Sequence, residues 1–311
     1  MKTKFIPKKT RCAILLLLFS LVVPACNRQS EIKSPDETLI EKLSDRLEKK
    51  DYVSSRSTNN PYDQTGRDAV EFRKFISTDA AFRKQIRLQN STKLGVVHAG
   101  LFQLTSVNSE KNWGIEDPNV LKLIKSKSQE FDERNGKEFD GSRIDKINDE
   151  LLLYSKDTDG VNKILENGFS KKAISKVQYE ILKMTVSQIS KADVREANSI
   201  NATVEHEVIN SSINDADKAM LLSINSLLAN DFEDQLSHLP DFDQKSTVFR
   251  KTAQALIVVG IAIAVGAAVG AINGTIVCCG LQNNNCKFAC VSGYIDDGAR
   301  LGIGFGLGLI K

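Results

Sequence analysis

The chain has 311 residues, with 42 Lys and Arg against 39 Asp and Glu, and a formal net charge of +3. Five of the basic residues and none of the acidic ones lie within residues 1–25. Without that segment, 37 basic residues face 39 acidic ones, so the remaining chain carries a charge of −2. This balance gives no electrostatic support to nucleic-acid binding, and we expect no nucleic-acid partner.

Residues 1–25 have the pattern of a secretory signal peptide. A basic start is followed by an apolar run from Ala13 to Val23 and then by Pro24, Ala25 and Cys26. This run is shorter than the roughly 20 residues that a membrane-spanning helix needs. Small residues before a cysteine resemble the lipobox of bacterial lipoproteins, in which that cysteine is acylated and begins the mature chain. The alternative is ordinary signal cleavage close to Cys26.

The lipobox resemblance implies that Cys26 carries acyl chains such as palmitate, which anchor the protein to membrane lipid. Residues 26–33 then form a short polar tether. By the same resemblance, Asn27 in place of an aspartate is compatible with sorting to the outer membrane. We therefore expect a lipid-anchored cell-envelope protein, in the outer membrane rather than the inner one.

Residues 34–250 are predicted to form a helical body. Ser34, Pro35 and Glu37 make a capping box that starts a helix, and further starts are expected at Asp117-Pro118 and at Ser142. Apolar residues repeat at helical spacing in four stretches: Leu39, Leu43 and Leu47; Ile144, Ile147 and Leu151; Ile174, Val177, Ile181 and Met184; Met220, Ile224 and Leu227. A polar loop is expected between residues 53 and 68. The narrow stripes predict an elongated helical bundle rather than a core with a sheet.

Residues 251–311 are predicted to form a glycine-rich apolar tail. Glycine is absent between Phe169 and Val259 and then occurs eleven times from Gly260 to Gly308, which indicates a module boundary near residue 250. The 18 residues from Ala255 to Ile272 carry no polar side chain. At 1.5 Å per residue, this run covers about 27 Å, close to the thickness of the hydrocarbon layer.

Glycines four residues apart share a helix face in each half of the tail: Gly266, Gly270 and Gly274, then Gly298, Gly302 and Gly306. Such faces let two helix backbones approach closely. Residues 298–310 also fit a strand with glycines on one face, and the sequence leaves helix and strand open there. We expect the two segments to pack together. The predicted fold is mainly α, an elongated helical bundle followed by an apolar glycine-zipper helical hairpin.

Four cysteines, Cys278, Cys279, Cys286 and Cys290, lie in the connector of the tail. An exported protein meets an oxidising compartment, so two disulfides are expected. Adjacent cysteines rarely pair with each other. This leaves Cys278 with Cys286 and Cys279 with Cys290, or Cys278 with Cys290 and Cys279 with Cys286. A zinc site needs ligand spacing such as CxxC, which the connector lacks.

One stretch matches part of a calcium-binding loop. Ser155, Asp157 and Asp159 stand at places 1, 3 and 5, Gly160 at place 6 and Glu166 at place 12. Serine at place 1 departs from the pattern. The alternative is an Asp-rich turn in which Asp159 caps a helix that begins at Gly160. Calcium bound by Asp157, Asp159 and Glu166 is thus a candidate, and no other cofactor is expected.

No motif for a nucleophile with its base, a P-loop or a dinucleotide site occurs in the sequence, so we expect no enzyme. The signal, helical body and tail resemble a group of uncharacterised bacterial lipoproteins. The tail alone is similar to glycine-zipper segments in secreted pore-forming and contact-dependent antibacterial proteins. The predicted function is a lipid-anchored envelope protein whose tail mediates membrane association or self-association. The alternative is a membrane-active antibacterial or pore-forming lipoprotein.

Overall fold

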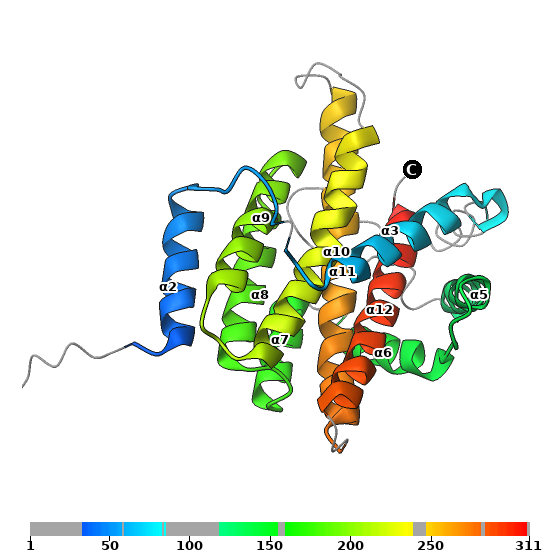
Figure 1. Ribbon diagram of the computed structural model, residues 1–311. Coiled ribbons are helices and arrows are strands. Elements are labelled where there is room, and N and C mark those ends of the chain that lie inside the picture. Colours follow the sequence, from blue (N-terminus) through cyan, green and yellow to red (C-terminus); the bar gives the residue numbers. More distant parts are fainter. Residues whose placement is uncertain are drawn as a thin grey trace, which may run out of the picture. The chain divides into compact units, whose positions relative to one another are not determined.

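The computed structural model describes residues 33–82 apart from residue 58, residue 84, and residues 118–154, 159–238, 247–280 and 284–309. This part of the chain is built from helices and contains no strand, which confirms the mainly α fold class. The helices, labelled in Figure 1, are α2 (Pro35–Glu48), α3 (Asp63–Thr78), α5 (Pro118–Arg134), α6 (Gly141–Tyr154), α7 (Gly160–Ser170), α8 (Lys176–Ile189), α9 (Val194–Asn210), α10 (Asp215–His238), α11 (Thr247–Cys278) and α12 (Asn284–Leu309).

The outer helices form where capping residues precede apolar stripes. Helix α2 buries Leu39, Leu43 and Leu47, and it packs on α8 and α9. Helix α8 starts with a capping box between Ser175 and Gln178, in which each side chain bonds to the other residue's backbone N–H. Because these contacts satisfy N–H groups that lack a partner within the helix, they fix where α8 begins.

Two boundaries differ from the sequence prediction. Helix α6 begins at Gly141, because the Asp140 carboxylate accepts hydrogen bonds from the backbone N–H and the hydroxyl of Ser142. Asp140 therefore takes the capping role that was predicted for Ser142. The predicted polar loop of residues 53–68 ends early, since α3 begins at Asp63. The buried residue Phe72 and its apolar neighbours on α3 stabilise a helix whose first turn is polar.

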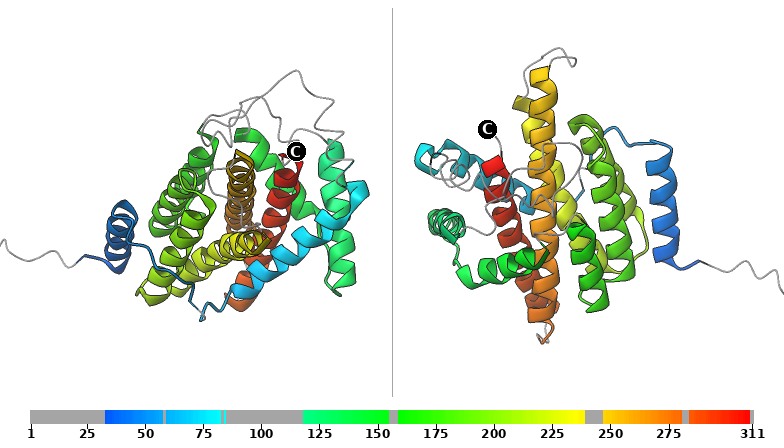
Figure 2. Two further views of the ribbon diagram at one scale, coloured as in Figure 1. Left: turned by 90° about the horizontal axis from the view of Figure 1, so that it is seen from above. Right: turned by 180° about the vertical axis from the view of Figure 1, so that it is seen from behind.

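Helices α11 and α12 form an antiparallel hairpin around which the other helices are arranged (Figure 2). Residues 298–309, whose conformation the sequence left open, belong to helix α12. Helices α6 to α10 contact α11, and α3, α5, α6 and α10 contact α12. The predicted tail is therefore the element on which the body packs.

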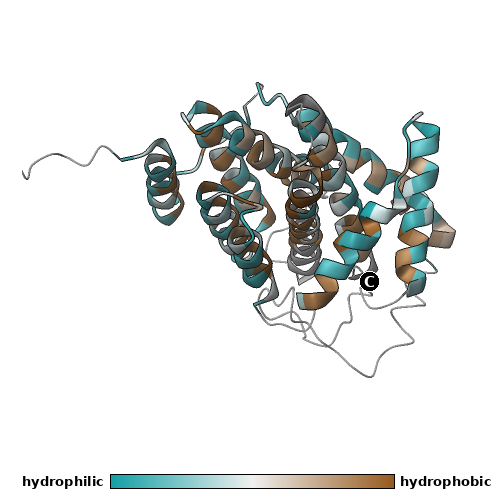
Figure 3. Ribbon diagram, turned by 90° about the horizontal axis from the view of Figure 1, so that it is seen from below, coloured by the Kyte–Doolittle hydropathy of each residue, from teal (hydrophilic) through white to brown (hydrophobic). Residues whose placement is uncertain are grey.

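The predicted boundary near residue 250 does not separate two compact parts, because Pro35–Lys311 form one compact unit. Among the described residues, one helical stretch, Val259–Cys278, is long and apolar enough to cross a membrane, and 78% of it is buried in the protein. Figure 3 shows the hydrophobic residues of α11 between helices that carry hydrophilic residues. In this fold the bundle shields the apolar segment from water.

Candidate functional site

The interface between α11 and α12 is closed by backbone contact. Gly266 of α11 lies against the backbone of Gly298, and Gly270 lies against the backbone of Tyr294. A methyl group on Gly270 would lie 2.7 Å from the carbonyl carbon of Tyr294, closer than real Cβ atoms approach. All six glycines of the predicted zipper lie at this interface: Gly266, Gly270, Gly274, Gly298, Gly302 and Gly306. The zipper thus joins two helices of one chain, and its faces are occupied in this fold.

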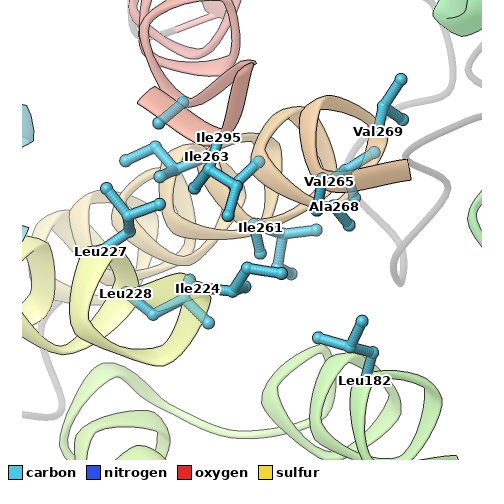
Figure 4. Close-up of a cluster of buried hydrophobic side chains, with 14 of the residues drawn as sticks. Leu182, Ile224, Leu227, Leu228, Ile261, Ile263, Val265, Ala268, Val269 and Ile295 are labelled. Atoms are coloured by element: carbon cyan, nitrogen blue, oxygen red, sulfur yellow. The ribbon is translucent and has the colours of Figure 1, made fainter. Parts of the chain in front are cut away.

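Helices α6 to α10 cover the remaining sides of α11, and α7 to α10 contribute apolar side chains to this cover. Leu182 of α8 and Ile224 and Leu228 of α10 point toward α11, where Val265 and Ala268 face them (Figure 4). A cavity of about 20 Å³, bounded almost entirely by apolar atoms, remains among these side chains. It has room for about one water-sized molecule. Side chains therefore fill the boundary between α11 and its cover, whereas backbone closes the boundary with α12.

Helix α12 carries Asp296, Asp297 and Arg300 on sides that do not touch α11, and we call these three residues the charged face. Asp296 and Arg300 stand two positions before and after Gly298, which touches α11. Successive residues of an α-helix are about 100° apart, so both lie about 200° round the helix from that glycine. The charged face is therefore directed away from the zipper, toward α3, α5 and α6.

Arg300 is buried between Asp132, Phe72 and Phe131 of the surrounding helices. Its side chain is 5% exposed, and a guanidinium N–H donates to the carboxylate of Asp132 on α5 across 2.7 Å. The guanidinium carbon lies 5.5 Å from the ring centroid of Phe72 and 5.3 Å from that of Phe131. The carboxylate and the two aromatic rings offset part of the cost of removing this cation from water.

Asp297 is 2% exposed, and its carboxylate lies 2.7 Å from the Nε atom of Arg143 on α6. Arg143 passes over Gly293, whose missing side chain leaves room for the guanidinium. Asp296 is half-buried, and one of its carboxylate oxygens has no hydrogen-bond partner within the described structure. The cluster thus contains three carboxylates, those of Asp132, Asp296 and Asp297, and two guanidinium groups, those of Arg143 and Arg300.

The charged face was not predicted from the sequence. The sequence YIDDGARLG is the signal for it, because three charged residues stand there within the apolar, glycine-rich part of α12. Charges at this spacing inside an apolar helix indicate either buried partners or contact with water inside a membrane. The first alternative is what this structure contains.

The turn of the hairpin is closed by a disulfide between Cys278 and Cys290, whose Cα atoms are 6.2 Å apart. Cys279 is a free, exposed thiol that donates to the carbonyl oxygen of Ile276. This corrects the expectation of two disulfides, because α11 ends at Cys278, which pairs with α12, whereas Cys279 lies in the turn that follows and is exposed. The side chain of Cys286 lies outside the described part of the chain. One pair of the second predicted connectivity is therefore present.

The end of α11 beside this turn leaves apolar side chains exposed. Ile276 is 42% exposed and Val277 is 49% exposed. Within the described residues, the other large apolar side chains at this level of exposure are Leu153 of α6 and Phe169 of α7. We call Ile276 and Val277 the hairpin tip. Among the described side chains of the hairpin, these two large apolar ones are exposed.

An ion-pair cluster fastens the segment before α3 to the bundle. The Arg56 guanidinium lies 2.9 Å from Glu205 of α9 and 2.7 Å from Asp63. Burial raises the pKa of Glu205, even though Arg56 opposes that change. Burial also acts to raise the pKa of Asp63, but hydrogen bonds from Asn230 and Arg56 outweigh it and lower that pKa. The cluster links three elements of the fold.

A second cluster joins α3 to α10. Asp231 is 1% exposed, and its carboxylate lies 2.6 Å from the Nε atom of Arg73. Burial raises the pKa of Asp231 to about 6, because the loss of water outweighs the attraction of Arg73.

A further contact joins the segment before α3 to α9. Glu196 of α9 accepts a hydrogen bond from the hydroxyl of Tyr52. Burial, together with the Glu196 carboxylate, raises the pKa of Tyr52 to about 12. Both contacts, this one and that of Arg73 with Asp231, link elements of the fold.

The calcium-loop residues are only partly described. Asp159 precedes α7, and its carboxylate accepts a hydrogen bond from the Asn162 side chain. Glu166 lies within α7, and Asp157 lies outside the described residues. In the part of the chain that the structure describes, no three His, Cys, Asp or Glu residues are grouped so as to hold a metal ion. The calcium loop stays a prediction.

Cys26, the signal peptide and most of the tether also lie outside the described residues. Comparison with protein-family models, curated proteins and solved structures finds no significant match for this chain. The glycine-packed hairpin, its charged face and its exposed tip are therefore the features from which a function has to be argued.

Proposed function

We propose that this chain is a lipid-anchored protein of the cell envelope, held at Cys26 in the outer membrane, whose glycine-zipper hairpin mediates membrane association by inserting into a bilayer. The hairpin then has two states. In water it is sheltered by the helical bundle, and in lipid the surrounding helices move aside. The proposal assigns no enzymatic reaction and no cofactor to the chain.

The observation that supports this function is the pairing of an uncharged 20-residue helix, Val259–Cys278, with a backbone-packed partner. Twenty helical residues span about 30 Å, the thickness of the hydrocarbon layer. Small residues that let two backbones touch are also what holds helices together in lipid, where the hydrophobic effect between helices is absent. The zipper can therefore keep the hairpin paired in both states.

A role as an ordinary core explains less of this arrangement. Helices of globular proteins average about 10–14 residues, and a core does not require an uncharged stretch of membrane length. The disulfide between Cys278 and Cys290 and the zipper join the two helices of the hairpin directly. Between α11 and the helices that cover it, side chains pack against side chains and leave a small cavity. On the side of α11, the cover is thus packed less closely than the interface between α11 and α12.

The test is release of an entrapped dye from vesicles of phosphatidylethanolamine and phosphatidylglycerol. The parent protein carries Cys26→Ala, so that acyl chains do not deliver it to the vesicles, and it is expected to release dye and to float with the vesicles. The variant Ile276→Asp with Val277→Asp places two carboxylates on the hairpin tip, which has to cross the bilayer. A charge in the hydrocarbon layer costs about 2.5–3.5 kcal/mol, so dye release should fall at least about tenfold.

The matched control is Leu153→Asp, which introduces one carboxylate in place of an apolar side chain of α6 that is 70% exposed. It should release dye as the parent does, because α6 lies outside the hairpin. If the parent protein neither releases dye nor floats with vesicles, the hairpin is only a core and the proposal is wrong. An equal loss in the Leu153→Asp variant would also contradict it, since the effect would then not depend on the tip.

A further inference from the structure

The charged face of α12 has partners in the bundle that do not belong to the hairpin. Asp132 belongs to α5 and Arg143 to α6, so both stay behind when the hairpin leaves its cover. We propose that, in a membrane, the charged face lines a water-filled path for cations between several hairpins. This inference rests on the proposed function and specifies what the inserted hairpin does.

In a membrane, α11 suits contact with lipid, whereas the charged face of α12 does not. After α7 to α10 move aside, α11 presents apolar side chains such as Val265 and Ala268, which suit lipid. The side of α12 with the zipper glycines is filled by α11. Charged residues within a membrane face one another or water rather than lipid, because each costs several kcal/mol in hydrocarbon. The charged face therefore has to turn toward water or toward other hairpins.

Two further glycines lie on the side of the charged face. Gly293 is covered by Arg143 of α6, and Gly304 is covered by the side chain of Ile124 of α5. When Arg143 and Ile124 move away with α6 and α5, no side chain fills the space beside Gly293 and Gly304. This leaves space along the same stripe of α12 for water beside Asp296, Asp297 and Arg300.

The sign of the charge specifies the permeating ion. Each hairpin contributes two carboxylates and one guanidinium to the path, a net charge of −1 when all three are ionised. Rings of acidic side chains favour cations over anions in membrane channels. The expected permeant is therefore a small monovalent cation such as K⁺.

The experiment measures currents across planar bilayers of phosphatidylethanolamine and phosphatidylglycerol that separate two concentrations of KCl. The protein is the full chain with Cys26→Ala, and the reversal potential reports which ion carries the current. The parent should prefer K⁺ over Cl⁻. The double variant Asp296→Asn with Asp297→Asn changes the net charge per hairpin to +1, so the reversal potential should change sign.

The matched control is Asp132→Asn, which removes a carboxylate from the same buried cluster but from α5, outside the hairpin. Its reversal potential should equal that of the parent. Equal reversal potentials in the parent and the double variant would overturn the inference. So would flotation of the parent with vesicles without any current, and in that case the proposed function stands. If the parent does not float with vesicles, both proposals fail together.

Discussion

The substitution Gly270→Ala tests whether the two backbones of the hairpin really touch. The added methyl group would lie 2.7 Å from the carbonyl carbon of Tyr294 and closer still to its oxygen. Ordinary contact begins at 3.4 Å, so the two helices have to separate by at least about 0.7 Å. The backbone carbonyl of Tyr294 cannot avoid the methyl group by a change of rotamer, as a side chain could.

The expected magnitude follows from two opposing effects. Overpacking costs about 1–3 kcal/mol, with the upper end applying where backbone has to move. Replacing a helical glycine by alanine contributes about 1 kcal/mol in the other direction. The free energy of unfolding should therefore fall by about 2 kcal/mol. For a unit of this size, the midpoint of thermal unfolding should fall by about 3–4 °C.

The assay is urea unfolding followed by circular dichroism, in the Cys26→Ala background. The control is Gly280→Ala, at a glycine with no atom within 4 Å of the added methyl, where the free energy should change by less than about 0.5 kcal/mol. A Gly270→Ala protein as stable as its parent would refute the backbone contact, and with it the zipper as the closure of the hairpin.

Three other perturbations address the turn, the buried cluster and the pH dependence. Removing the disulfide with Cys278→Ala and Cys290→Ala, which are 12 positions apart, should lower the free energy of unfolding by about 3 kcal/mol, measured in urea. Arg300→Met should lower it by about 3–5 kcal/mol, since Asp132 is left as an uncompensated buried charge. The raised pKa of Asp231 means that the folded state holds a proton which the unfolded state releases near pH 4. Stability should therefore decrease as pH rises from 4 to 6, by up to about 3 kcal/mol relative to Asp231→Asn at matched pH.

Each of these has its own control. Cys279→Ala removes a thiol outside the disulfide and should leave the urea midpoint unchanged. Adding Asp132→Asn to Arg300→Met should recover part of the lost stability, and no recovery would contradict the stranded-charge explanation. For the pH series, parallel curves for the parent and Asp231→Asn would mean that this carboxyl does not titrate between the two pH values.

The sequence predicted the outer helices wherever a local signal decides the structure. The cap at Ser34 and the stripe of Leu39, Leu43 and Leu47 depend on neighbours within a few residues, and α2 follows them closely. The cap of α6 at Asp140 was missed because serine and aspartate two positions apart are both good capping residues. Only the orientation of the two side chains distinguishes them.

The position of the hairpin at the centre of the bundle could not be predicted from local sequence patterns. The glycine spacing predicted two closely packed segments, and the same spacing fits a tail that stands alone or a core that others surround. Which of these forms depends on apolar stripes of α3 and α5 to α10, each too narrow to reveal its partner. The partners of the charged face were equally hidden, since Asp132 and Arg143 precede Arg300 by more than 150 residues.

The order of the helices along the chain has a consequence for when the protein folds. Helices α3 and α5 to α10 all pack on α11 or α12, which are made after them. Until residues 247–309 have emerged, the earlier helices have no finished core on which to settle, and their contacts span long stretches of sequence. The bundle therefore completes its packing only when α12, the last helix to be synthesised, joins α11.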